Sequence, residues 1–245
     1  MVEQEAVAAR LRAADGRWST VRGVFRTWRD QALVTQAFMD WHHIDEAADT
    51  GQNGATSFVV TAGREDQGAG DESGVEHVLR VCAAEHGRRR RAEAISRTGE
   101  QWMADVVVVD EPWFWARKDD DVLTNDGDPR STHGGADFVL LLRPNAVPDG
   151  FDLSATGTTE TVAGRLCDLV VATPKDPAAY DETLPGAEVF DMTSGGRDFM
   201  LCVDQQTSTL MRIAKLVGGE PAEIVEYLDI AFDEPVGEGI FGPLA

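Results

Sequence analysis

The stretch from Thr161 to Asp233 constrains the fold most, because runs of strand-forming residues alternate there with turn-forming residues. The turns are made by Pro174, by the polar segment Gln205–Ser208, by Gly218-Gly219 and by Pro235. The runs between them cover residues 162–174, 197–204, 209–217 and 223–233. Such a series predicts an antiparallel, curved sheet with one apolar face and one solvated face.

The residues before this stretch predict a short N-terminal helix and then more strands. Apolar residues share one helical face over residues 3–14, and Gly16 ends the pattern. Residues 31–43 combine helical spacing with strand-forming side chains; we expect a strand, continuing a hairpin from Trp28 through Arg29-Asp30. The expected strands of this half cover residues 20–28, 31–43, 56–62, 75–83, 89–96 and 101–109.

Several polar or glycine-rich segments are expected to be loops. Gly63–Gly74 lacks the spacing and the following helix of a dinucleotide-binding loop. Arg88–Arg91 is expected at an exposed hairpin tip, the alternative being an anion-binding spot. The acidic run Lys118–Asp128 does not match an EF-hand calcium loop and is expected to be solvated. A short helix over Gly134–Leu142 and a connection over Pro144–Gly157 lead into the strand series.

Composition and length bound the class of protein. A chain of 245 residues with 42% hydrophobic and 27% charged residues suits one globular domain, which we expect to span residues 1–245. The formal net charge of −21 opposes binding to nucleic acid and to anionic lipid surfaces at long range. An acid-rich surface also fits adaptation to a salty cytoplasm.

The cysteines and the N-terminus bear on location. Cys82, Cys167 and Cys202 form no CxxC pair and are expected to be buried thiols, with one disulfide left open if two face each other. The first residues lack the apolar core and cleavage site of a signal peptide, and no transmembrane segment is evident. The sequence as written therefore predicts a cytoplasmic protein; a trimmed exported protein would look the same.

The order of short motifs along the chain resembles the LolA-like superfamily. The motifs are the Trp102–Asp105 strand, the aromatic and acidic segment after it, and the sequence Val-Ala-Gly-Arg at 162–165. A Val-Asp-x-x-Thr-x-x-Leu hairpin and a last strand ending Phe-Asp-Glu-Pro follow. The superfamily includes lipoprotein carriers, RseB and MucB sensors and LppX-type lipid binders, and the likeness is to its actinobacterial members.

The resemblance implies an α+β fold: a single-domain half-open β-barrel of antiparallel strands, with short helices as a lid over an apolar cavity. A cavity of that kind takes acyl chains. The absence of an export signal departs from the lipoprotein carriers, which act outside the cytoplasm. Curved sheets with one apolar face bury that face under helices or around a ligand, which agrees with the resemblance.

Tryptophan and its aromatic neighbours are the candidate ligand-binding residues. Tryptophan joins a large apolar area to an N–H group that needs a partner, which suits the mouth of a cavity, although core filling explains such residues equally well. In a strand, Phe114 would face away from Trp113 and Trp115, so these three cannot share one cavity wall. The candidates are Trp28, Trp41, Trp102, Trp113, Phe114 and Trp115.

Signals for catalysis are sparse. Asp105, among apolar residues, is the best candidate for a carboxyl group with a raised pKa, the alternative being an outward-facing polar residue. His42 and His43 are adjacent and would point to opposite faces of a strand, which argues against a metal pair. We expect no metal and no cofactor.

Two functions fit these observations. The first is a non-enzymatic binder, a carrier or sensor that takes a hydrophobic small molecule or lipid. The second is a cytoplasmic, cofactor-free cyclase or isomerase that folds a polyene or polyketide-type substrate in the same pocket. A protein partner that grips the sheet edge or the lid is a further alternative.

Overall fold

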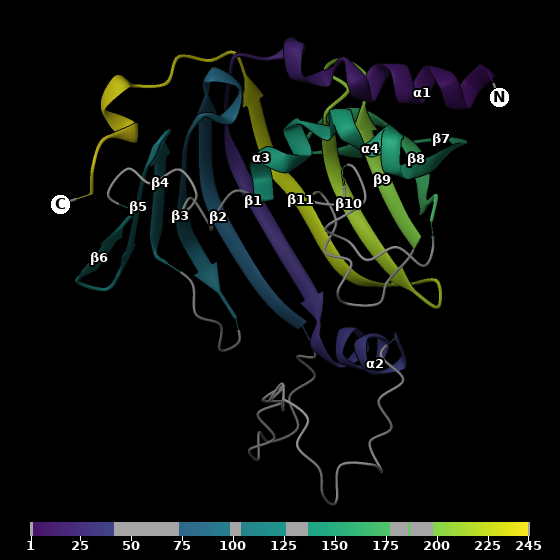
Figure 1. Cartoon of the computed structure of the whole chain (residues 1–245), viewed down its shortest axis with the longest axis horizontal. Helices are drawn as coiled ribbons and strands as arrows, with labels where there is room; N and C mark the ends of the chain where they lie inside the picture. The colour runs from purple at the N-terminus through teal and green to yellow at the C-terminus, as the bar shows by residue number, and fades with distance from the viewer. Residues whose placement is uncertain are drawn as a thin grey trace, which may run out of the picture.

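The computed structural model describes residues 2–41, 74–98, 104–125, 137–176, 186 and 198–244. The helices and strands of the first half (Figure 1) are α1 (Val2–Arg12), η1 (Ala14–Arg17), β1 (Thr20–Asp30), α2 (Gln31–Trp41), β2 (Gly74–Ala84), η3 (Glu85–Gly87), β3 (Arg89–Arg97), β4 (Val106–Asp110), β5 (Trp113–Lys118) and β6 (Asp121–Thr124). Those of the second half are α3 (Asp137–Leu142), η5 (Pro144–Ala146), α4 (Val147–Gly150), β7 (Phe151–Val162), β8 (Arg165–Pro174), β9 (Asp198–Asp204), β10 (Leu210–Val217), β11 (Glu220–Phe232) and η9 (Glu238–Phe241).

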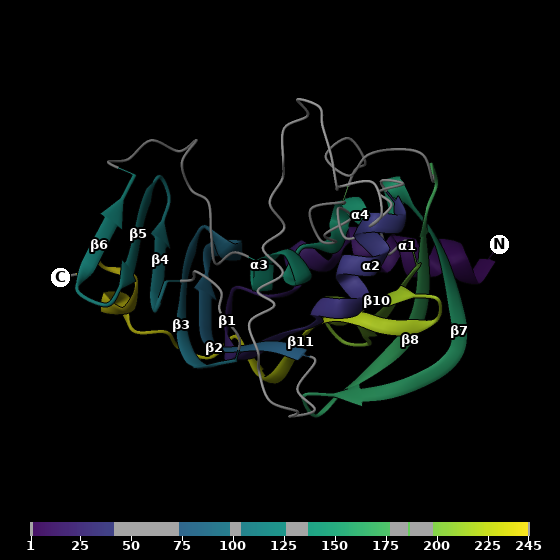
Figure 2. The ribbon, with the colours of Figure 1, turned by 90° about the horizontal axis from the view of Figure 1, so that it is seen from below.

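All described strands belong to one 11-stranded antiparallel sheet in the order β6-β5-β4-β3-β2-β1-β11-β10-β9-β8-β7. The first and last strands along the chain, β1 and β11, pair at the centre of the sheet. The sheet bends around α1, α2, α3 and α4 without closing, as Figure 2 shows. The expected α+β fold with a half-open antiparallel sheet and short helices is therefore confirmed.

We call the face that carries Phe25 and Tyr227 the inner face, because α3 packs on it. The Phe25 and Phe138 rings lie 6.3 Å apart, and the Tyr227 hydroxyl donates a hydrogen bond to the Phe138 carbonyl oxygen at 2.6 Å. The buried core continues from these residues across β8, β9 and β10 to α1 and α4. On the outer face, Phe241 of η9 packs against Cys82, Val106 and Val108. The two faces are thus covered by different parts of the chain.

The prediction of a strand over residues 31–43 is wrong, because residues 31–41 form the helix α2. The Asp30 side chain accepts a hydrogen bond from the Leu33 backbone N–H at 2.9 Å, which is the geometry of an N-cap. Val34 and Ala37 are buried three residues apart, as the helical spacing requires. Figure 1 shows α2 at one end of the sheet, and α1 at the opposite end.

The expected boundaries also change around β7, β8 and β6. Residues 162–174 are not one strand: Ala163 and Gly164, with φ of 50° and 75°, form the turn between β7 and β8. The expected connection 144–157 contains η5, α4 and the start of β7. The expected loop 118–128 contains β6, which pairs with β5. The strand expected over 101–109 begins at Val106, and the one expected over 56–62 lies outside the described residues.

Candidate functional site

The inner face of the sheet is built from cross-strand rows of apolar side chains. One such row runs from β1 across β11, β10, β9 and β8, and its members, paired strand by strand, are Thr27, Val225, Ile213, Leu201 and Val170. The last three of these are at most 3% exposed. Because alternate residues of a strand face the same side, one register fixes the whole row on the side of the helices. Across β8 to β11 this row therefore forms an apolar wall on the inner face.

The next row toward α2 carries charge at one end. It runs Arg29, Glu223 and Lys215 and continues with Phe199, Ala172 and Leu153. Glu223 accepts hydrogen bonds from Arg29 Nη2 at 3.0 Å and from Lys215 Nζ at 2.9 Å. The Lys215 side chain is 4% exposed. A lysine buried so deeply within an apolar strand is unusual, and burying a charge is costly unless it is paired.

His77 and Arg97 extend this charged region onto β2 and β3. His77 pairs with Thr27 on one side and with Arg97 on the other, so all three lie on the inner face. Burial lowers the pKa of His77, and the positive charges of Arg97 and Arg29 lower it further. This end of the inner face therefore gathers ionisable side chains from β1, β2, β3, β10 and β11.

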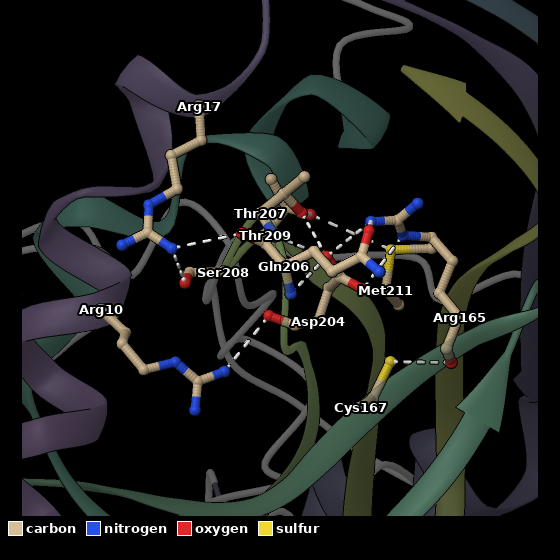
Figure 3. Close-up of polar contacts among 10 residues, drawn as sticks. All are labelled: Arg10, Arg17, Arg165, Cys167, Asp204, Gln206, Thr207, Ser208, Thr209 and Met211. Atoms are coloured by element: carbon tan, nitrogen blue, oxygen red, sulfur yellow. Dashed lines mark hydrogen bonds and ion pairs between the residues drawn. The ribbon is translucent and has the colours of Figure 1, made fainter.

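A second polar cluster joins the β9–β10 hairpin to β8, as Figure 3 shows. The Asp204 side chain is only 2% exposed. Its carboxylate accepts hydrogen bonds from Arg165 Nε at 3.0 Å and from Arg165 Nη2 at 2.9 Å. Its Oδ2 also accepts hydrogen bonds from the backbone N–H and the hydroxyl of Thr207, both at 2.6 Å. The Gly-Arg and Val-Asp-x-x-Thr motifs of the sequence therefore meet here, where they fix a turn.

The same hairpin anchors the N-terminal helices. Arg10 of α1 donates to Asp168 Oδ2 at 2.5 Å and to the Asp204 carbonyl oxygen at 3.2 Å. Arg17 of η1 donates to the Ser208 hydroxyl at 3.1 Å (Figure 3). These polar contacts lie beside the buried Leu11 and Trp18. The cluster thus stabilises the position of α1 over the end of the sheet. Its polar side chains form these hydrogen bonds with one another and with the backbone.

The structure separates the predicted ligand-binding residues. The rings of Trp113 and Trp115 are stacked, with their centroids 6.2 Å apart. In the register of β4 and β5, Trp113 pairs with Asp110 and Trp115 with Val108, so both lie on the outer face. Trp115 packs there against the cluster that contains Phe241. Phe114 lies on the opposite side with Val109 and Ala116, so the expected split is confirmed.

The remaining members of that set lie elsewhere or are not described. Trp28, three residues beyond Phe25 in an unbroken register, is on the outer face, over Gly74. Trp102 lies outside the described residues, and so does the side chain of Trp41. The structure therefore brings no described pair of them together on the inner face.

The prediction of a raised pKa at Asp105 is wrong. The backbone N–H of Asp119 donates to Asp105 Oδ2 at 2.7 Å, and Arg97 Nη2 donates to Oδ1 at 2.7 Å. These contacts lower the pKa of Asp105, the hydrogen bond from Asp119 most of all. Asp105 precedes β4 at a bend, where it joins the ends of β3 and β5. It is a carboxylate that holds a turn.

The prediction that Arg88–Arg91 form an exposed basic tip holds for Arg88 alone. The side chains of Arg89, Arg90 and Arg91 are 27%, 11% and 23% exposed, against 64% for Arg88. Carboxylates within 4 Å of the four guanidinium groups belong to Glu85, Glu93, Asp110 and Glu111. The segment is a balanced ionic cluster, because each cation has an acidic neighbour.

The cysteines are free thiols and all three are buried, as expected. Within the described ranges, no group of three or more His, Cys, Asp or Glu side chains is placed to hold a metal ion. His42 and His43 lie outside those ranges. None of the helices that the structure describes is long and apolar enough to cross a membrane.

Sequence reasoning missed the charged row at Arg29, Glu223 and Lys215. The signal was present in β10, where Lys215 follows Ile213 by two residues and therefore shares its face. Glu223 likewise precedes Val225 by two residues in β11. The pairing of these strands was needed to show that the two charges meet.

Comparison with known proteins bears on the fold. No protein-family model matches the sequence, and no curated protein matches it. Among solved structures, LprF from Mycobacterium bovis matches with a TM-score of 0.50 at 12% identity, covering 97% of this chain and 96% of LprF. MucB matches with a TM-score of 0.49 at 16% identity, and a LolA superfamily protein from Nitrosomonas europaea with 0.33 at 9%.

Coverage is uneven among these structures. The match with MucB covers 100% of this chain and 64% of MucB, whereas the match with the Nitrosomonas protein covers 98% of this chain and 97% of that one. Identities this low bear on the fold alone. The half-open sheet, the helices inside its curve and the likeness to LprF agree with one another. The chain therefore shares its overall fold with LprF.

Proposed function

We propose that the protein binds a hydrophobic small molecule or lipid between the inner face of its sheet and the helices. The observation that carries this proposal is the apolar wall formed by rows such as Ile213, Leu201 and Val170 in a sheet that does not close. Short helices, rather than a second sheet, cover this wall. An apolar ligand would bind by removing its surface from water, which contributes at most about 0.8 kcal/mol per methylene.

Two observations favour binding over cyclisation of a polyene. Glu223, a carboxylate on the inner face, is paired with both Arg29 and Lys215. Asp105, the other candidate acid, has a lowered pKa. A general acid that protonates a substrate near neutral pH needs a raised pKa instead. We therefore propose a carrier or sensor in preference to a cyclase or isomerase.

The predicted ligand-binding residues become a test of which face the ligand occupies. Phe114 is on the inner side of β5, whereas Trp28, Trp113 and Trp115 are on the outer side. Trp41 and Trp102 remain candidates from the sequence. If the ligand lies in the curve of the sheet, Trp113→Ala should leave its binding unchanged. If the ligand lies on the outer face, the same substitution should abolish binding.

The experiment is a binding titration with a series of saturated fatty acids from 10 to 16 carbons, each competing with a fluorescent fatty acid. Affinity should rise with chain length, by no more than about fourfold per methylene. Organic extraction of the purified protein followed by mass spectrometry would show a co-purified hydrophobe directly. Absence of binding for every chain length, together with an empty extract, would overturn the proposal.

A further inference from the structure

The strand β6 forms the end of the sheet opposite β7, away from α1, α2, α3 and α4 (Figure 1). In the part of the chain that the structure describes, β6 has a neighbouring strand on one side only, which is β5. Arg117 of β5 directs its carbonyl oxygen toward β4, where the Asp105 N–H donates to it at 2.7 Å. Val122 pairs with Arg117 and therefore directs its own N–H and carbonyl oxygen away from β5. This edge thus presents main-chain groups to an added strand.

Exposed apolar side chains gather at the same edge. Of the seven large hydrophobic residues that are exposed in the described part of the chain, three belong to β5 and β6. They are Trp113, Val122 and Leu123, which are 46%, 39% and 55% exposed. Val122 lies on the outer face with Trp115, and Leu123 lies on the inner face with Ala116. A strand added beside β6 would therefore cover apolar surface on both faces of the sheet.

The charge at this edge bears on the kind of chain that can be added. Residues 119–121 are three consecutive aspartates that lead into β6, and all three are exposed. Among the described residues, no hydrogen bond or ion pair of their carboxylates is found. Of the adjacent cations, Lys118 acts on Asp105, and Arg117 offsets one of the three charges. With a formal net charge of −21 on the chain, this excess favours a positively charged partner and opposes a second copy of the same chain.

We propose that β6 binds an extended, positively charged segment of a partner protein, which adds a strand to the sheet. The main chain of the segment pairs with Val122, its apolar side chains lie beside Val122 and Leu123, and its basic side chains lie near residues 119–121. An uncovered edge strand pairs with other chains unless charge prevents it. The aspartates repel acidic chains and attract basic ones, so they select the partner.

The test compares three peptides of roughly eight residues, the length of an ordinary strand, each labelled with fluorescein and blocked at both ends. The first alternates lysine with valine. The second is the same peptide N-methylated at every residue, which removes its main-chain donors and keeps its side chains. The third has glutamate in place of lysine. Fluorescence anisotropy should show that the wild-type protein binds the first roughly tenfold more tightly than either of the others.

A proline substitution tests the main-chain contact at β6. Val122→Pro removes an N–H that points away from β5, so it should weaken binding of the lysine peptide by about three- to tenfold without breaking the pairing with β5. The matched control is Thr161→Pro on β7, at the other end of the sheet. The Gln205 N–H donates to the Leu166 carbonyl oxygen at 3.1 Å, so Leu166 faces β9. Thr161, which pairs with Leu166, therefore directs its N–H away from β8, and its substitution should leave peptide binding unchanged.

A second set of variants tests the charge. Substitution of all three aspartates at 119–121 by Asn should weaken binding of the lysine peptide by about tenfold and reduce its dependence on ionic strength. The control removes the same number of charges at exposed positions of β9 and β11, through Asp198→Asn, Glu220→Gln and Asp229→Asn together. This control should bind the peptide as the wild-type protein does. Circular dichroism and thermal unfolding would confirm that each variant folds.

The outcomes also separate this inference from the proposed function. Equal affinity of the wild-type protein for the three peptides, or no binding of the lysine peptide, would overturn the inference whichever variants fold. Equal loss in Val122→Pro and Thr161→Pro would exclude β6 as the site. Dimerisation in sedimentation experiments that Val122→Pro abolishes would make the occupant a second copy and overturn the basic partner. Fatty-acid binding should be the same in all of these variants, because none of them alters the apolar rows of β8 to β11 that the proposed function uses.

Discussion

Arg165 and Asp204 form a two-point ion pair between adjacent strands, with Nε to Oδ1 at 3.0 Å and Nη2 to Oδ2 at 2.9 Å. The carboxylate is buried, and Thr207 saturates it from the following turn. The Asp204 carboxylate therefore fixes the β9–β10 hairpin to β8, and the backbone carbonyl oxygen of the same residue accepts a hydrogen bond from Arg10 of α1.

Substitution of Asp204 by Asn should lower the free energy of unfolding by roughly 3 kcal/mol, because it removes the buried charge that pairs with Arg165 and accepts two hydrogen bonds from Thr207. Urea denaturation followed by circular dichroism measures this change. Asp198→Asn, at an exposed position of the same strand, is the control and should change stability by less than about 0.5 kcal/mol. Equal stability of the two variants would show that the ion pair contributes nothing.

The pH dependence of stability should follow the lowered carboxyl pKa values. Burial raises the pKa of Asp204, but hydrogen bonds from Arg165 and Thr207 outweigh it and leave the pKa lowered. Burial also raises the pKa of Asp168, but hydrogen bonds from Arg10 and Gln205 outweigh it and leave that pKa lowered. The unfolded chain, with an Asp pKa of about 3.9, therefore binds these protons more readily than the folded protein does.

Stability from these groups is present above about pH 4 and is lost as the pH falls through the folded-state pKa values. The urea midpoint should therefore decline below about pH 5 and continue to fall toward pH 3. In Asp204→Asn, whose side chain does not titrate, the decline should be shallower. A midpoint that stays constant down to pH 3, or an unchanged slope in the variant, would contradict this explanation.

The sequence predicts most of the strands, because their ends are set by local turn chemistry. Gly218-Gly219 and the Gln205–Ser208 segment form tight turns where they were expected. The helix α2 was missed because Val34 and Thr35 favour strands, whereas Asp30 acts as an N-cap and outweighs them. An Asp N-cap at position 30, together with the helical spacing of Leu33 and Ala37, favours a helix over a strand here.

The candidate site was less accessible from sequence. The motif residues Arg165, Asp204 and Thr207 were recognised, but their contacts depend on the register between β8 and β9. The apolar neighbours of Asp105 in sequence predict a raised pKa, whereas its contacts come from Arg97 and Asp119 and lower the pKa. Pairing between distant strands determines such environments, and no local pattern encodes it.

The cysteines should be unreactive in the folded protein. Burial raises the pKa of Cys82 to about 11, that of Cys167 to about 12 and that of Cys202 to about 11. The thiolate is the nucleophile, so iodoacetamide at pH 8 should modify none of them before unfolding and all three in urea. Mass spectrometry of intact protein counts the adducts. Rapid modification of native protein at any of them would contradict the burial.

The two sides of β5 should differ in their effect on stability. Phe114→Ala removes a side chain that is 9% exposed and packed against Val109 and Ala116, and should cost about 3 kcal/mol. Trp113→Ala removes a side chain from a residue that is 46% exposed and should cost less than about 1 kcal/mol. Thermal unfolding compares them. A larger loss for Trp113 would place the packed side of the strand on the outer face.

The turn between β2 and β3 requires glycine at position 87 for two separate reasons. Gly87 has φ of 88°, a conformation that strains any residue with a Cβ. A Cβ at this position would also overlap Cγ1 of Val139 in α3. Gly87→Ala should therefore lower the free energy of unfolding by about 2–4 kcal/mol, as the sum of backbone strain and overpacking.

A second glycine separates the two causes. Gly157 has φ of 75° but no neighbour within 4 Å of the added Cβ, so Gly157→Ala should cost only about 1–2 kcal/mol. Combining Gly87→Ala with Val139→Ala removes the overlap and should give a coupling energy of about 1 kcal/mol or more in a double-mutant cycle. Additive losses in that cycle would mean that α3 does not pack on this turn.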